Sequence, residues 1–143
     1  MTTQEILLPL FVEVILTFLL WVGMAVLRTR DFGSGTVRPE EIALREPKWP
    51  ERTLQFGFAF SNQFEIPVLF YVLTILAYVT HLAGLIFVIL AWIFVVFRLL
   101  HAYVHVTSNT VRVRGTFYGI AVVALAINWA IYIVEVLTLP RPV

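Results

Sequence analysis

The chain has 143 residues, of which 60% are apolar and only 13% charged, and its mean hydropathy is +0.91. A soluble domain is about half apolar and about a quarter charged, so this composition excludes an ordinary soluble protein. A net charge of +1 gives no support for nucleic acid as a partner, and the absence of cysteine excludes disulfides, thiolate metal sites and cysteine nucleophiles.

Four apolar runs are long enough to cross about 30 Å of hydrocarbon at about 1.5 Å per residue. They cover residues 6–27, 55–80, 83–106 and 115–137. The first run follows a segment without positive charge (MTTQE) and has no small-residue cleavage site after it, so we interpret it as a retained span. The sequence therefore predicts an all-α integral membrane protein, one domain over 1–143, built as an up-down-up-down four-helix transmembrane bundle.

Basic residues gather on one side of these predicted spans. Those between the first two spans and after the third are Arg28, Arg30, Arg38, Arg45, Lys48, Arg52, Arg112 and Arg114. By the positive-inside rule, the loops 28–54 and 107–114 face the cytoplasm and both termini face the other side. In the longer loop, Pro39 begins a predicted short helix that ends at Arg45 before Pro47. Because the chain is short and minimal, we expect it in a bacterial inner membrane.

The second and third spans carry polar side chains at helical spacing. Asn62 and Glu65 share one face of the second span, and Arg98, His101 and His105 form one stripe on the third. A very short turn joins these spans as an antiparallel hairpin, which puts the two sets at a similar depth, about 12–16 Å from the cytoplasmic side. We expect a polar cleft open to the cytoplasm, with Glu65 and Arg98 within ion-pair distance.

These polar residues also have simpler interpretations. The expected pair of Glu65 and Arg98 is equally compatible with a structural lock on the hairpin, and Arg98 alone can extend toward the lipid headgroups. His101 and His105 lack a certain third ligand, so no metal site is predicted. Pro67 predicts a kink just beyond Glu65 because it removes one helical hydrogen bond.

The fourth span begins with Arg114 and Tyr118, one helical turn apart. Such a pair is typical of a membrane-interface anchor. Between them Gly115 and Gly119 form a GxxxG motif, which is a close-packing surface for another helix.

Three more polar residues lie within the predicted spans. Asn128 is expected to form a hydrogen bond across helices. Glu13 and Glu135 fall in the non-cytoplasmic parts of the first and fourth spans, where cationic partners are few. For Glu13 we expect only a helix contact or a protonated acid.

Taken together, the motifs resemble those of the membrane-associated proteins in eicosanoid and glutathione metabolism, the MAPEG family. Ala59-x-x-Asn62-x-x-Glu65 is similar to the family's second-helix motif. Arg98-x-x-His101 and Arg114-x-x-x-Tyr118 resemble its third- and fourth-helix positions, and the resemblance covers the whole chain.

This resemblance implies a homotrimer that binds glutathione, as cosubstrate, between neighbouring subunits at the cytoplasmic side. It assigns Arg114 and Tyr118 to catalysis, with Arg114 stabilising the thiolate. The residues assigned to glutathione binding are Asn62, Glu65, Arg98, His101 and His105, with Arg98 acting from within the bundle. Two positions depart from the family pattern: Ser61 replaces an arginine of the glutathione-using members, and His105 occupies a position that is often tyrosine.

The resemblance implies a glutathione- or other thiol-dependent transferase or peroxidase acting on lipophilic electrophiles that enter from the bilayer. Its partners would be membrane lipids, a lipophilic small molecule and copies of itself. Two other functions fit the same sequence, because fold does not fix activity. One is a non-catalytic lipid-binding or scaffold membrane protein, and the other is an accessory subunit of a larger membrane complex.

Overall fold

The computed structural model describes residues 1–43 and 48–138, and in them every regular element is helical. Four helical segments are long and apolar enough to cross a membrane: Thr3–Gly33, Glu51–Val79, Leu85–Val106 and Val111–Thr138. Each predicted run overlaps one of these segments, with ends that differ by at most six residues, and many large apolar side chains on their outer faces are exposed. The chain is therefore a multi-pass membrane protein.

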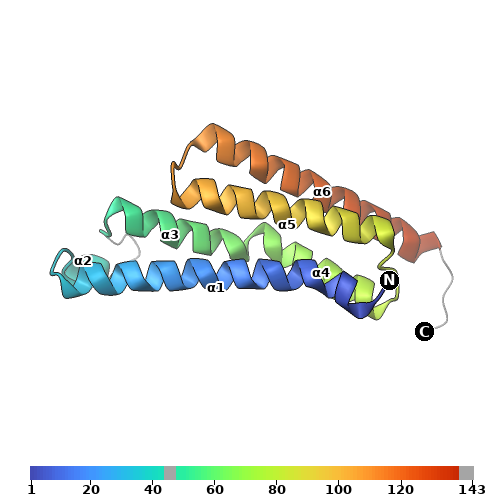
Figure 1. The fold of residues 1–143 in the computed structure, drawn as a ribbon, viewed down its shortest axis with the longest axis horizontal. Coiled ribbons are helices and arrows are strands. Elements are labelled where there is room, and N and C mark those ends of the chain that lie inside the picture. Colours follow the sequence, from blue (N-terminus) through green and yellow to red (C-terminus); the bar gives the residue numbers. More distant parts are fainter. Residues whose placement is uncertain (44–47, 139–143) are drawn as a thin grey trace.

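The helices run back and forth along one long axis. α1 (Thr3–Gly33) is followed by the short α2 (Pro39–Ile42), and the second span divides into α3 (Glu51–Ser61), η1 (Asn62–Phe64) and α4 (Ile66–Val79). α5 (Leu85–Val106) and α6 (Val111–Thr138) complete the bundle. Figure 1 shows the start of α1, the end of α6 and the α4–α5 turn at one end, with α2 and the α5–α6 turn at the other.

The short helix in the long loop begins at Pro39, as predicted, with Glu40 and Glu41 in its first turn. Acidic side chains there are favourable because the N-terminus of a helix carries partial positive charge. The structure follows α2 to Ile42, and the predicted end of this helix at Arg45 and Pro47 lies outside the described residues.

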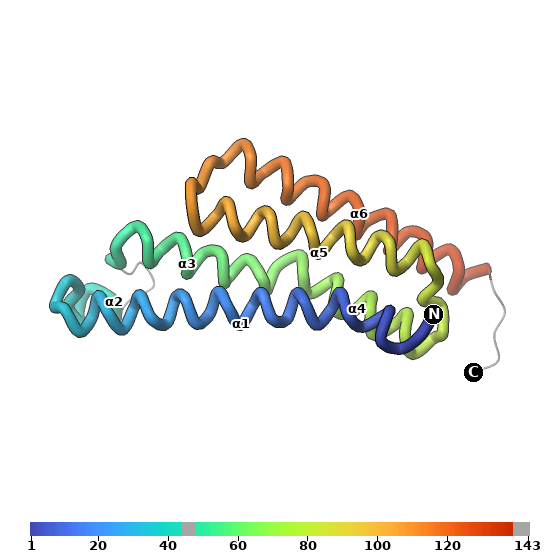
Figure 2. The backbone as a smooth tube through the Cα atoms, viewed as in Figure 1, coloured from blue at the N-terminus to red at the C-terminus, as the bar shows by residue number. Residues whose placement is uncertain are grey.

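α5 lies at the centre of the packing. It contacts α6 along much of its length, and α1 and α3 lie against its other side, an arrangement that Figure 2 traces as a tube. The rings of Phe70 on α4 and Phe94 on α5 stack at 4.6 Å between centroids, and both side chains are fully buried. A smaller apolar cluster nearer the α2 end joins Leu20 of α1, Ala59 of α3 and Ala102 of α5.

Candidate functional site

The second span is interrupted where the predicted site residues lie. α3 ends at Ser61, one turn of 3₁₀ helix covers Asn62–Phe64, and Glu65 leaves the helical region of backbone space with φ −98° and ψ −110°. Pro67 lies in the first turn of α4 and has no N–H to donate to the carbonyl of Gln63. The predicted kink is confirmed. At this depth the freed backbone groups need partners from within the protein.

Arg98 of α5 supplies one of these partners. Its guanidinium donates from Nη1 to Oδ1 of Asn62 at 2.7 Å and from Nη2 to the backbone carbonyl of Asn62 at 3.3 Å. The Arg98 side chain is fully buried. A single cation thus holds both the side chain and the main chain of Asn62 at the break.

The counter-ion of Arg98 is Glu13 of α1, whose Oε1 lies 3.6 Å from Nε, and both side chains are 0% exposed. Gln63 lies between them. With its amide nitrogen toward Glu13, that nitrogen donates to Oε1 at 2.8 Å and the amide oxygen accepts from Nη2 of Arg98 at 3.0 Å. We call Glu13, Asn62, Gln63 and Arg98 the Arg98 cluster.

The expected ion pair between Glu65 and Arg98 is wrong. Among the described residues, the ion pair that Arg98 forms is with Glu13. Glu65 is exposed, and its Oε2 accepts a hydrogen bond from Nδ2 of Asn62 at 3.0 Å, so Asn62 connects the two charges. Glu65 lies on an exposed face of the second span, whereas the Arg98 side chain is buried inside the bundle, where Glu13 of α1 meets it.

A polar cavity of about 400 Å³ opens beside the break, between α3 and the α5–α6 turn. Residues from the first turns of α3 form one side of it. The polar residues around the rest are Ser61, Asn62, Glu65, His105, Asn109 and Arg114. Cationic, anionic and neutral hydrogen-bonding groups therefore converge on one space, which suits a small ligand that carries several charges.

The α5–α6 turn fixes Arg114 at this cavity. Its Nη1 donates to Oδ1 of Asn109 at 2.5 Å. Its backbone carbonyl lies 2.8 Å from Nδ1 of His101, which must carry the hydrogen because a carbonyl only accepts. The His101 and His105 rings meet edge to face at 5.6 Å.

The predicted site residues divide into two groups. Four of them line the polar cavity: Asn62, Glu65, His105 and Arg114. Behind it, Arg98 and His101 are buried, and the half-buried ring of Tyr118 lies 5.8 Å from the Arg98 guanidinium and 5.5 Å from the His101 ring. Residues 1–43 and 48–138 contain no group of three or more His, Cys, Asp or Glu able to hold a metal.

Sequence reasoning missed two members of this network, Glu13 and Gln63. Both are polar residues inside apolar runs and both are fully buried, at 0% and 1% exposure. The available signal was the cost of an unpaired carboxylate within a span, which requires a cationic partner for Glu13 from another helix.

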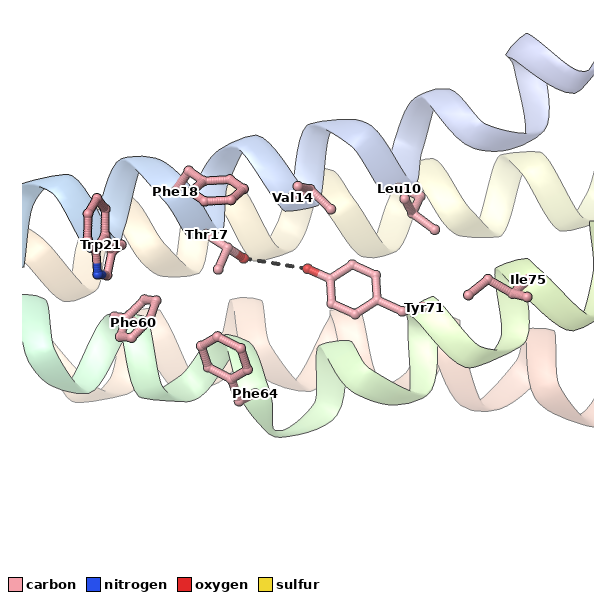
Figure 3. A pocket seen from close by; sticks show the side chains of 9 residues that line it. All are labelled: Leu10, Val14, Thr17, Phe18, Trp21, Phe60, Phe64, Tyr71 and Ile75. Atoms are coloured by element: carbon pink, nitrogen blue, oxygen red, sulfur yellow. Dashed lines mark hydrogen bonds between the residues drawn. The ribbon is translucent and has the colours of Figure 1, made fainter.

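A second, apolar cleft of about 510 Å³ lies between α1 and the segment from α3 to α4. Figure 3 shows its aromatic lining, which is formed by Phe18, Trp21, Phe60, Phe64 and Tyr71. Its polar feature is the contact between the hydroxyls of Thr17 and Tyr71, 3.5 Å apart. Phe60 and Phe64 face this cleft while their neighbours Ser61 and Glu65 face the polar cavity, so the second span separates the two spaces.

The fold and site define a class of protein: a four-span membrane protein with a polar cavity at one end of its bundle. The sequence model of the MAPEG family matches residues 6–134, and the chain belongs to that family. Comparisons with curated proteins and with solved structures give no match.

Proposed function

We propose that the protein binds glutathione, or a similar acidic thiol, in the polar cavity and transfers it to a lipophilic electrophile. The observation that carries this proposal is the Arg114 guanidinium at a 400 Å³ cavity also lined by Asn62 and Glu65. Glutathione has two carboxylates, an ammonium group, two amides and a thiol. The cavity offers a cation for the thiolate, a carboxylate for the ammonium group and an amide for the peptide groups.

The chemistry needs a thiolate at neutral pH. A fixed guanidinium favours the anionic form of a bound thiol, so Arg114 would hold the sulfur ready to attack. The sulfur then forms a bond to the electrophilic carbon while the bond from that carbon to its leaving group breaks, and the leaving group departs with the electron pair. Tyr118 lies one turn from Arg114 but behind the cavity lining, so its hydroxyl would donate to the developing anion only after its side chain turned toward the cavity.

The membrane supplies the second substrate in this proposal. A lipophilic electrophile concentrates in hydrocarbon and reaches the bundle laterally, whereas the charged thiol enters at the polar end. The basic loop next to the cavity favours a cytoplasmic opening by the positive-inside rule. A homotrimer, as the family implies, would place a neighbouring subunit against the site.

Turnover by the purified protein in detergent tests the proposal. Glutathione and an activated aryl halide should give a thioether and halide faster with the protein than without it. Arg114→Ala should remove this turnover. Arg112→Ala is the matched control, because Arg112 is an exposed arginine on the same helix that lies outside the cavity lining, and it should keep turnover. If the wild-type protein gave no rate above the uncatalysed reaction with several thiols and electrophiles, the proposal would be rejected.

The apolar cleft favours a second candidate function, non-catalytic binding of a membrane lipid. It is lined almost wholly by apolar and aromatic side chains and lies within the spans. A lipid that copurifies with the wild-type protein but not with Val14→Trp, which would fill the cleft, supports this function. Val22→Trp is the control, because Val22 is exposed on the same helix outside the cleft lining.

A further inference from the structure

Glu13 lies on a helix that contributes nothing to the lining of the polar cavity, yet an ion pair and a series of hydrogen bonds link it to that lining. Glu13 faces Nε of Arg98, and the two terminal nitrogens of Arg98 hold Asn62. The Asn62 amide nitrogen donates to the Glu65 carboxylate at the cavity.

A buried pair of this kind is weak evidence of a role in stability. Removing two charges from water costs free energy that their attraction often fails to recover, and apolar residues of similar volume usually serve the stability of a fold as well or better. What the pair adds is direction, because Gln63 donates to Glu13 Oε1 and accepts from Arg98 Nη2, which ties the guanidinium to the carboxylate while Nη1 donates to Asn62.

The direction of the Arg98 donors matters at Asn62, because one end of the side-chain amide accepts hydrogen bonds and the other end donates them. Arg98 occupies the acceptor oxygen at 2.7 Å, so the amide nitrogen must turn the other way, toward Glu65 at 3.0 Å. Arg98 also holds the Asn62 carbonyl within the helix break. The orientation of both cavity groups thus depends on where the Arg98 guanidinium lies.

We propose that Glu13 is a positioning residue for the polar cavity, acting through Arg98 on the Asn62–Glu65 pair. The structural link stands on the contacts above, and its relevance to thiol chemistry rests on the proposed function. Glu13→Gln should therefore alter the Asn62 amide and weaken glutathione binding, although residue 13 touches neither the cavity nor its ligand.

The first test does not depend on glutathione. The chain has three asparagines, Asn62, Asn109 and Asn128, whose side-chain amides can be observed by NMR after selective ¹⁵N labelling and assigned by substitution. Asn128 donates to the Phe87 carbonyl between α6 and α5, so it reports on the intact fold away from the cluster. In Glu13→Gln the Asn62 amide signals should shift while those of Asn128 stay in place.

The matched control is Glu135→Gln, which makes the same chemical change on another helix and should move neither signal of Asn62. Glu13→Asp keeps the charge on a shorter side chain and should shift the Asn62 signals less than Glu13→Gln. An unchanged Asn62 amide in Glu13→Gln, or equal shifts at Asn62 and Asn128, would overturn the proposal.

The second test is a double-mutant cycle on glutathione affinity. Glu13→Gln should raise the Kd about tenfold in the wild-type background and leave it unchanged in an Asn62→Ala background, because coupled residues act non-additively. Equal effects in both backgrounds would overturn the route through Asn62. If the wild-type protein binds no glutathione, the proposed function fails, and the amide signals still decide the role of Glu13.

Discussion

Ser61 departs from the residue pattern of the family members that use glutathione, and this departure can be tested. It is exposed and lines the polar cavity beside Asn62, where the family resemblance leads one to expect an arginine. Among the described residues that line the cavity, Arg114 is therefore the single arginine or lysine, and no second one is there for a ligand carboxylate.

Restoring that cation should strengthen binding. Ser61→Arg adds a fork of donors for a carboxylate, and such a charge-assisted hydrogen bond is worth about 1.5–3 kcal/mol, so glutathione affinity should rise by about tenfold or more. Calorimetric titration in detergent measures the change. Ser108→Arg adds the same charge in the α5–α6 turn outside the cavity lining and should leave the affinity near that of wild type. Unchanged or weaker binding by Ser61→Arg would show that the ligand carboxylate does not lie there.

The helices themselves were predictable from the sequence, because apolar runs of more than twenty residues have few alternatives in a bilayer. The break in the second span was predictable too, since Pro67 cannot donate a backbone hydrogen bond. The partner of Arg98 was not. A short turn fixes the relation of the second and third spans. The carboxylate of Glu13 signals only that α1 needs a cationic partner on another helix, and the packing of α1 decides that this partner is Arg98.

Close packing of α1 against α3 gives a prediction at the scale of the element. A Cβ atom at Gly23 would clash with the ring of Phe56, whereas one at Gly57 would meet atoms only at 3.7 Å and beyond. Gly23→Ala should lower the free energy of unfolding by about 1–3 kcal/mol through overpacking. Gly57→Ala should be neutral or raise it by up to about 1 kcal/mol through helix propensity.

Unfolding of the two variants in mixed micelles, followed by circular dichroism, measures this difference. Phe56→Leu combined with Gly23→Ala should recover part of the loss, because a smaller side chain makes room for the added methyl group. Equal stabilities of Gly23→Ala and Gly57→Ala would contradict the observed approach of α1 to α3.

At the scale of the whole molecule, α6 presents a surface that the described parts of the chain leave uncovered. Gly115 and Gly119 are exposed, and a Cβ atom added at either would meet nothing within 4 Å. A GxxxG surface allows a second helix to approach closely, so we expect it to contact a neighbouring subunit in the homotrimer that the family resemblance implies.

Gly119→Leu should therefore lower the fraction of protein that is oligomeric, while the helical content of the chain is retained. Thr138→Leu places the same side chain at an exposed position at the other end of α6, away from the GxxxG motif, and should leave the assembly intact. Light scattering corrected for bound detergent gives the mass of each. A wild-type mass of one 16.4 kDa chain would reject the trimer, and a trimer of Gly119→Leu would place the interface elsewhere.

The central claim is that the cavity binds a thiol as its thiolate beside Arg114. The most direct measurement is the ultraviolet absorbance of the thiolate when glutathione is titrated at neutral pH into the protein in detergent, with S-methylglutathione as the control that lacks a thiol. We predict a saturable thiolate signal for the wild-type protein, none for Arg114→Ala, and a smaller one for Arg114→Lys, because a point charge does not reproduce the guanidinium fork. No thiolate signal at saturating glutathione, or an equal signal in Arg114→Ala, would contradict the account.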